Sequence, residues 1–482
     1  MTSPADLTLT EVAARIRAGT LTSEETTRAC LERIEKVGPP INAFVAVEAE
    51  RAIAQSRAAD ASLRAGHLVG PLHGVPLAHK DMFYRAGEES ACGSLIRRGW
   101  KAPVTADTLV RLDRAGAVTL GRLGMSEFAI GPIGLNVHYG PVRNPWNTAH
   151  VSGGSSSGPA AAVASRLAFG AMGSDTGASI RVPAAACGVV GLKPSVGLIE
   201  RAGTMPLSST LDVVGPIART VRDVALLTAV LAAPADIDLT TAVHPAFRIA
   251  AAGNGAPPPG LRVGIPCNFF VDDLDPQIVD LFKGACHILR DLRLSVVEVD
   301  ASAFAAAGQL YGTIFGAEAS ALHARLLDER SQDYSPQVRA RLQSGRAVSA
   351  EAYVAALAER ARLLPRVLAE VFGLVDVVVA PVLSRPVPTL SAVDVGAGPQ
   401  MTEVIGWFLR LTSPVNVLGL PALSVPAGFT SDGLPFGIQL ISTPWADPLL
   451  LELGSAFERA AGLSAAPPLF PRRIPLSPGA LA

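Results

Sequence analysis

Apolar positions recur with a helical period along the first 65 residues of the chain. Thr8 with Glu11, and Thr22 with Glu25, have the spacing of a capping box. In that motif a hydroxyl side chain and a glutamate three residues later satisfy the free N–H groups of a helix start. A third amphipathic run covers residues 48–66. We therefore predict three helices at the start of the chain.

After residue 66 the pattern changes to short apolar runs between Gly and Pro residues, which is typical of buried strands. Three such runs are "GVPLAHKDMF", "GAVTLGRLG" and "GVVGLKPSVG". Further strands are predicted at 261–266, at 374–383 and in "ALSVPAGF" and "FGIQLI". Longer helices fit residues 274–292, 303–365 with an interruption near "SQDYSP", and 447–461. Strands alternating with helices predict an α/β layer architecture.

The organisation of the chain predicts one domain, residues 1–482. Residues 1–65 supply the N-terminal helices, and residues 66–230 hold the densest Gly/Pro-framed strands. Residues 231–260, which end in "GNGAPPPG", have no sustained period and read as a surface connection. The remainder, residues 261–482, supplies further strands and the covering helices.

Composition narrows the class of protein. Apolar residues make up 49% of the 482 residues, and the net charge is −1 without a basic run. This balance lacks the electrostatic footprint of a nucleic-acid or membrane-surface protein. No apolar run approaches the ~18 residues of a membrane span, and the N-terminus lacks the apolar block of a signal peptide. Five scattered cysteines without a CxxC pair fit reduced thiols, so we expect a cytoplasmic protein.

The stretch "SGGSSSG", residues 152–158, is the first candidate for chemistry. A linker does not fit, because the stretch runs directly into the helical "PAAAVASRLAFG". A nucleotide-binding loop does not fit either, because Gly-x-x-x-x-Gly-Lys-Ser/Thr is absent. A nucleophile elbow centred on Ser156 would need a strand before it and a histidine after it. Only His244, His287 and His323 follow the stretch. A Ser-x-x-Lys site is excluded as well, because no lysine has a serine three residues before it.

A serine nucleophile with a lysine base from elsewhere in the chain remains. Lys80 is the candidate, because it ends the apolar run "PLHGVPLAHKDMF". Burial disfavours the charged form of a lysine and lowers its pKa, so that the amine can accept a proton near neutral pH. Composition alone leaves open the alternative that Lys80 extends its ammonium into water from a strand end.

Several motifs together resemble the amidase signature family of serine hydrolases. These are "GVPLAHKD", "RNPW", "GGSSSG", "GSDTGASIRVPAAACGVVGLKP" and "MPLSSTLDVVGPIART". The resemblance is dense between His73 and Asp223 and weaker over residues 412–445. It implies an α/β fold with a large twisted mixed sheet that helices cover on both faces. It also implies hydrolysis of a carbon–nitrogen bond without a metal or cofactor.

The same resemblance assigns roles to individual residues. It implies that Ser179 is the nucleophile, that Ser155 is a bridging serine after a cis peptide bond, and that Lys80 is the base. It further implies that backbone N–H groups hold the oxyanion, and these belong to Thr176, Gly177, Ala178 and Ser179.

Supporting roles are expected for the charged residues nearby. Asp175 looks like the acid of a triad, but this mechanism needs no carboxylate, so we expect a structural role. Arg181 and Asp212 are expected to anchor loops internally. For Ser156 two interpretations stay open, a hydrogen bond within the lysine network and a purely structural role.

Two further positions and two departures from the family pattern complete the predicted site. Met125 and Phe128, in "GMSEFAIG", either line the substrate pocket or pack in the core. Ala178 stands where members of the family usually have glycine, which would strain the turn if its φ were positive. Pro159 replaces a small polar residue and is harmless if it lies in the first turn of a helix.

The expected substrate is a small, uncharged or aromatic amide, because no acid-binding cluster is evident in the sequence. The same triad would serve a carbamate (urethane) or ester hydrolase. Another alternative is the glutaminase subunit of a tRNA-dependent amidotransferase, although "LYGTIFGAEASALHARLLDE" lacks the Arg-Tyr-Asp-Gly run of such subunits. A non-catalytic binding protein on the same fold is the last alternative. We expect a monomer or homodimer whose partner is a small-molecule amide or carbamate.

Overall fold

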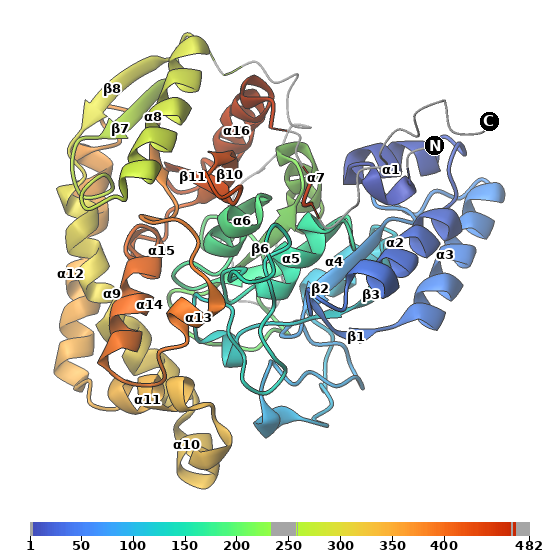
Figure 1. Cartoon of the computed structure of the whole chain (residues 1–482), viewed down its shortest axis with the longest axis horizontal. Helices are drawn as coiled ribbons and strands as arrows, with labels where there is room; N and C mark the ends of the chain where they lie inside the picture. Colours follow the sequence, from blue (N-terminus) through green and yellow to red (C-terminus); the bar gives the residue numbers. More distant parts are fainter. Residues whose placement is uncertain (1–2, 233–256, 258, 464–465, 469–482) are drawn as a thin grey trace, which may run out of the picture.

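The computed structural model describes residues 3–232, 257, 259–463 and 466–468. Within them, eleven strands form one mixed sheet in the order β1-β3-β2-β4-β6-β5-β10-β11-β9-β7-β8 (Figure 1). The strands are β1 (Phe44–Val47), β2 (Pro76–Lys80), β3 (Val118–Leu123), β4 (Gly170–Asp175), β5 (Val190–Lys193), β6 (Val213–Ala218), β7 (Arg262–Pro266), β8 (Ser295–Val299), β9 (Val377–Pro381), β10 (Ala422–Phe429) and β11 (Pro435–Ser442).

The centre of the sheet is buried on both faces. Every residue of β2, β4, β6, β9 and β11 is buried, which explains why these segments read as nearly continuous apolar runs. Strand β2 pairs in parallel with β3 and β4, whereas β4 pairs with β6 in antiparallel fashion. The sheet is therefore the large mixed sheet that the family resemblance implies.

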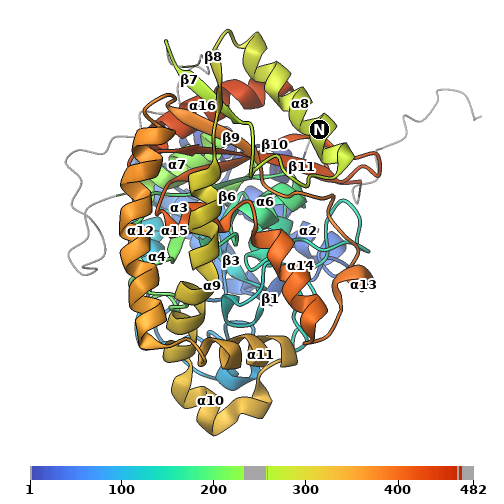
Figure 2. The same cartoon turned by 90° about the vertical axis from the view of Figure 1, so that its left-hand side faces the viewer.

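Helices surround the sheet (Figure 1). The helices are α1 (Leu9–Arg17), α2 (Ser23–Val37), α3 (Ala49–Arg64), α4 (Asp107–Arg114), α5 (Ser157–Ala164), α6 (Arg181–Cys187), α7 (Val221–Leu231), α8 (Pro276–Asp291), α9 (Ser302–Leu322), α10 (Ala324–Arg330), α11 (Pro336–Gly345), α12 (Ala350–Glu370), α13 (Leu390–Val393), α14 (Pro399–Leu409), α15 (Ser413–Val417) and α16 (Asp447–Ala461). Helices α9, α11, α12 and α14 cover the end of the molecule opposite α1, α2 and α3 (Figure 2).

Most predicted elements are confirmed. Both capping boxes are formed, at the starts of α1 and α2. The single long segment predicted at 303–365 divides into α9, α10, α11 and α12, and its breaks include the predicted one near "SQDYSP". The helix after the Ser/Gly loop begins at Ser157, so Pro159 lies in its first turn as expected. The predicted connection 231–260 lies almost entirely outside the described residues.

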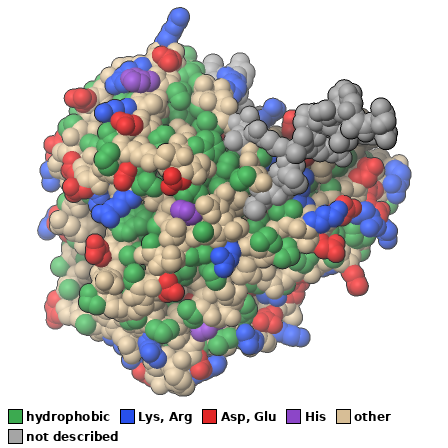
Figure 3. Space-filling model, viewed as in Figure 1, with side chains coloured by type: hydrophobic (Ala, Val, Ile, Leu, Met, Phe, Trp, Pro, Cys, Tyr) green, Lys and Arg blue, Asp and Glu red, His purple; other side chains and the backbone are tan. Residues whose placement is uncertain are grey.

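The surface gives no sign of a nucleic-acid or membrane footprint on the face drawn in Figure 3, where acidic and basic side chains are interspersed. Within the described ranges, no helix combines the length and the apolar character that a membrane crossing requires.

Helices α9 and α11 cross at a pair of glycines. A Cβ atom added to Gly316 would lie 3.3 Å from the Cα of Gly345. A Cβ added to Gly345 would overlap the Ser320 hydroxyl and the Gly316 carbonyl. The two backbones therefore approach so closely that only glycine fits at residue 345.

We expect Gly345→Ala to lower the free energy of unfolding by about 1–3 kcal/mol, because the new methyl group overpacks the crossing. Chemical denaturation measures this change. The matched control is Gly284→Ala in α8, whose Cβ would meet no atom within 4 Å. The control should leave stability unchanged or raise it by up to ~1 kcal/mol through helix propensity. Equal effects of the two substitutions would contradict the packing argument.

Candidate active site

Lys80 lies at the end of β2 and points into the interior between two serines. Its side chain is 1% exposed. The Nζ atom donates to Oγ of Ser155 at 2.7 Å and to Oγ of Ser174 at 2.8 Å. The peptide bond between Gly154 and Ser155 is cis, as the family resemblance implies. The structure therefore brings the predicted base and the predicted bridging serine into direct contact.

Burial changes the acid–base behaviour of this lysine. It lowers the pKa of Lys80 to about 7, although the carboxylates of Asp175 and Asp212 act in the opposite direction. Burial also lowers the pKa of Lys193 to about 7. The Nζ of Lys193, however, donates to the carbonyl of Pro194 rather than to a serine. Lys80 is thus the buried lysine that contacts hydroxyl groups.

Ser156, for which two roles were open, connects the Ser/Gly loop to β4. Its Oγ donates to the carbonyl of Ser174 and accepts from the N–H of the same residue, both at 3.2 Å. Ser156 is fully buried and precedes the first residue of α5. Ser156 thus does not contact Lys80 through these bonds. It fixes the backbone of Ser174, whose hydroxyl accepts a hydrogen bond from Lys80.

Ser179 lies in the turn between β4 and α6, beside the Ser/Gly loop. Its carbonyl accepts from the N–H of Ser156 at 3.2 Å. The hydroxyl of Ser179 makes no hydrogen bond with Ser155 in the described part of the chain. Ser179 instead lines a small cavity of about 10 Å³ together with the preceding residues Thr176, Gly177 and Ala178.

The backbone N–H groups of this turn were predicted from the family resemblance to hold the oxyanion. Within residues 3–232 and the other described ranges, the N–H groups of Gly177, Ala178 and Ser179 donate to no protein acceptor. Ala178 does not have a positive φ, so alanine fits there without the strain considered above. A Cβ at Gly177 would lie 2.6 Å from the hydroxyl of Tyr311 in α9, so close packing requires glycine at that residue.

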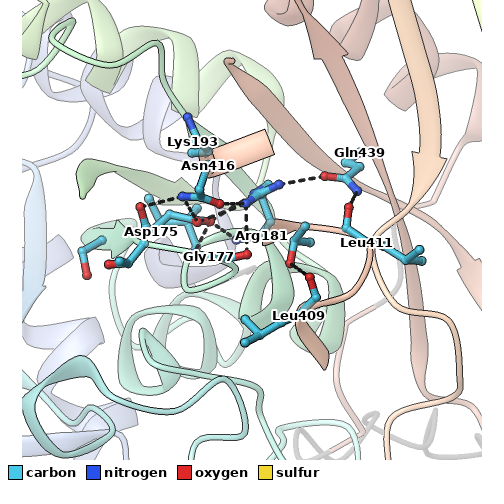
Figure 4. A network of polar contacts seen from close by, with 12 residues as sticks. Asp175, Gly177, Arg181, Lys193, Leu409, Leu411, Asn416 and Gln439 are labelled. Carbon is cyan, nitrogen blue, oxygen red and sulfur yellow. Dashed lines mark hydrogen bonds and ion pairs between the residues drawn. The ribbon is translucent and has the colours of Figure 1, made fainter. Parts of the chain in front are cut away.

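A buried ion pair holds the turn from inside the protein (Figure 4). The guanidinium of Arg181 lies 3.1 Å from the carboxylate of Asp175, and both side chains are fully buried. Asp175 also accepts from the N–H groups of Ile180 and Arg181. Burial alone would raise the pKa of Asp175, but the charge and hydrogen bonds of Arg181 hold it below its usual value. The expected structural roles of both residues agree with these contacts.

Two amides from the C-terminal half complete this network. Asn416, in α15, donates to Asp175 at 3.0 Å and accepts from Arg181. Gln439, in β11, accepts from Arg181 at 2.9 Å and donates to the carbonyl of Leu411 at 2.7 Å. Arg181 also donates to the carbonyl of Gly177 in the turn. The turn that carries Ser179 is thereby fixed to α15 and β11, which are distant from it in the sequence.

Asp212 anchors the other side of the turn, as expected. Its carboxylate accepts from the Thr176 hydroxyl at 2.6 Å and from the N–H groups of Leu207 and Ser208. Burial raises the pKa of Asp212 against these hydrogen bonds. Asp212 therefore joins two loops through neutral donors.

Met125 and Phe128 lie in the core rather than around the cavity. They are 2% and 1% exposed, and Phe128 packs against His323 with ring centroids 4.7 Å apart. Neither lines the cavity beside Ser179. The neighbouring residues Ala129 and Gly131 line it instead. The core interpretation of Met125 and Phe128 therefore fits the structure.

Sequence reasoning missed several residues that surround the predicted site. Ser174 stands directly before Asp175 in "GSDTGAS", and no local sequence pattern marks it as a partner of Lys80. The wall of the cavity comes from the second half of the chain, where no motif marks it. That wall consists of Tyr311, Phe315, Arg341 and Leu409.

Comparison with known proteins agrees with this geometry. The family model described as Amidase matches residues 25–451. The chain belongs to the amidase family. This amidase-family chain is therefore a hydrolase of carbon–nitrogen bonds at the level that the family defines, and its fold is that of the amidase signature enzymes.

Three relatives illustrate the range of the family. A glutamyl-tRNA(Gln) amidotransferase subunit from Chloroflexus aurantiacus is 38% identical, over 95% of this amidase-family chain and 97% of that protein. The structure of 6-aminohexanoate cyclic dimer hydrolase with its substrate superposes with a TM-score of 0.87 at 28% identity, covering 96% and 99% of the chains. The structure of peptide amidase from Stenotrophomonas maltophilia superposes with a TM-score of 0.81 at 30% identity, covering 95% of this chain and 98% of that chain.

We expect Arg181→Met to lower the free energy of unfolding by about 3–5 kcal/mol, because it leaves the carboxylate of Asp175 buried and unpaired. Denaturant titration measures this loss. The double variant Arg181→Met with Asp175→Asn removes the lone charge and should recover part of the stability. A single variant less than ~1 kcal/mol below wild type would show that the pair does not hold the turn.

Proposed function

We propose that the chain hydrolyses an amide bond through an acyl-enzyme on Ser179, with Ser155 as proton relay and Lys80 as base. The observation that carries this proposal is the 2.7 Å hydrogen bond between Lys80 and Ser155 in a fully buried setting. Burial brings the pKa of Lys80 to about 7, so that a large fraction of the amine is neutral at physiological pH. The N–H groups of Gly177, Ala178 and Ser179 would receive the oxyanion.

The reaction has two halves in this proposal. In the first, Ser179 transfers its proton to Ser155, Ser155 transfers its own to neutral Lys80, and the Ser179 oxygen bonds to the carbonyl carbon. The relay then returns a proton to the nitrogen as the carbon–nitrogen bond breaks, which releases an amine or ammonia. In the second half, water attacks the ester carbon by the same relay. The carbon–oxygen bond to Ser179 breaks, and the acid leaves.

Arg341 supports an amide that carries an acid group as the substrate. This proposal replaces the uncharged amide that was expected from the sequence. Its guanidinium lies over the ring of Phe315 at 4.9 Å and hydrogen-bonds with Tyr311 at the wall of the Ser179 cavity. No carboxylate of the described residues pairs with it. A guanidinium stays charged when burial lowers its pKa, so an anionic group of the substrate is its natural partner.

A second candidate is the glutaminase subunit of a tRNA-dependent amidotransferase. The relative from Chloroflexus aurantiacus, 38% identical over 95% of this chain, favours it over the small uncharged or aromatic amide expected from the sequence and over carbamate or ester cleavage. Glutamine is also an amide that carries a carboxylate, and Arg341 at the wall of the Ser179 cavity would bind that carboxylate. This candidate would add partner subunits and an RNA-linked acceptor to the small-molecule partner that the sequence suggested.

The rate at which a fluorophosphonate labels Ser179 tests the base. We expect the rate to rise about tenfold per pH unit below ~6 and to level off above ~8, because only neutral Lys80 accepts a proton and its pKa is about 7. Lys80→Met should reduce the rate by about 10²–10⁴-fold at neutral pH. Stopped-assay mass spectrometry of the labelled peptide gives both the site and the rate.

Lys193→Met is the matched control, because Lys193 is equally buried but donates to the Pro194 carbonyl rather than to a serine. It should keep the pH profile of labelling. An adduct on Ser156 instead of Ser179 would overturn the mechanism in favour of a nucleophile elbow.

The substrate class is tested by a hydrolysis panel with Arg341→Met. We expect this variant to raise KM for glutamine and other acid-bearing amides by about 10–100-fold, since a hydrogen bond to a charged group contributes about 1.5–3 kcal/mol. Neutral anilides, aryl carbamates and esters in the same panel should be little affected. Arg339→Met, on the same helix and outside the cavity wall, is the control. Equal losses for charged and neutral substrates would contradict the role of Arg341.

A further inference from the structure

The small cavity beside Ser179 adjoins a much larger one. The larger cavity has a volume of about 980 Å³ and lies between α9, α11 and α14. Four residues line both cavities, namely Tyr311, Phe315, Arg341 and Leu409. The larger cavity is therefore the neighbouring space for the part of a substrate that extends from Ser179 past these four side chains.

Glycines line the larger cavity on all three helices, and they fall into two kinds. Gly316 and Gly345 serve the close crossing of α9 and α11 described above. Gly312 of α9 and Gly406 of α14 have no such role, because a Cβ at either would meet no atom within 4 Å. Both have ordinary φ values, so their backbone does not require glycine either.

Glycine within a helix is unfavourable by about 1 kcal/mol relative to alanine. No neighbouring atom and no backbone conformation accounts for Gly312 and Gly406. What their missing side chains leave is the open space of the cavity itself. The two residues are exposed and line the same cavity from different helices, so a side chain added at either would extend into open space there.

The lining of this cavity indicates what it would hold. Most of its side chains are apolar, including Phe315, Val348, Met401 and Ile405. Its charged residues are Arg341, next to the Ser179 cavity, and Glu403, which is exposed on α14. An apolar body attached to the amide would be desolvated there with a favourable transfer free energy.

We propose that the cavity between α9, α11 and α14 binds a bulky, largely apolar part of the amide substrate, and that Gly312 and Gly406 determine the size it accepts. This assignment rests on the proposed function, because it places the scissile amide at Ser179. It separates the chain from a hydrolase restricted to small amides such as glutamine.

Equilibrium binding tests the cavity without depending on catalysis. In the Ser179→Ala background, calorimetry with 4-phenylbutyramide should show binding that Gly312→Leu and Gly406→Leu each weaken at least ~10-fold, as a filled apolar pocket discriminates by that order. Gly284→Leu in α8 is the control, because it makes the same change at an open helical glycine away from the cavity. It should bind like the background. Absent binding, or equal binding by all four proteins, would overturn the proposal.

Catalytic measurements on the same substitutions distinguish this proposal from the proposed function. With Ser179 present, Gly312→Leu should reduce kcat/KM at least ~10-fold for 4-phenylbutyranilide while changing that for acetanilide less than ~2-fold. Loss of both activities together would contradict a role in size selection. If wild-type Ser179 reacts with no fluorophosphonate while the calorimetry succeeds, the cavity stands and the proposed chemistry fails.

Discussion

A lysine amine buried between serine hydroxyls is the interaction on which the proposed chemistry depends. In water Lys80 would be protonated and unable to accept a proton at neutral pH. The interior that lowers its pKa to about 7 also requires hydrogen-bond partners for the amine, because an unpartnered buried polar group is costly. Ser155 and Ser174 meet that requirement. The two hydrogen bonds therefore reduce the cost of burying the amine, and the burial that they permit lowers its pKa.

The second constraint is the fixed shape of the turn that carries Ser179. In the proposed mechanism its N–H groups bind the oxyanion, and within the described residues they make no backbone hydrogen bond. The ion pair of Asp175 and Arg181 holds the turn instead. Asn416 connects this ion pair to helix α15, and Gln439 connects it to strand β11. A buried ion pair is stable only when its remaining donors and acceptors are satisfied, and here two amides satisfy them. The turn is thereby coupled to α15 and to β11, which lies four places from β4 in the strand order.

Elements with a local signal were predicted from the sequence, whereas strands β1, β4, β6 and β8 were not predicted. Capping boxes marked α1 and α2, and Gly/Pro-framed apolar runs marked β2, β3 and β5. The contact of Lys80 with Ser155 followed from the family resemblance rather than from periodicity, since 75 residues separate them. Ser174 was missed because a serine in a buried strand has no distinctive local pattern. The roles of the three predicted site residues still await the labelling experiment.

The substrate was the least predictable feature, and the structure gives a physical reason. The family resemblance is dense over residues 73–223, which supply Lys80, Ser155 and the turn of Ser179. The wall of the cavity comes from α9, α11 and α14, between residues 302 and 409, outside both stretches that carry the resemblance. Proton transfer tolerates little change in geometry, whereas a wall of helices can change shape by single residues such as Gly312. One catalytic centre can thus cleave different amides, and the residues of the helices that face it would determine which amide is accepted.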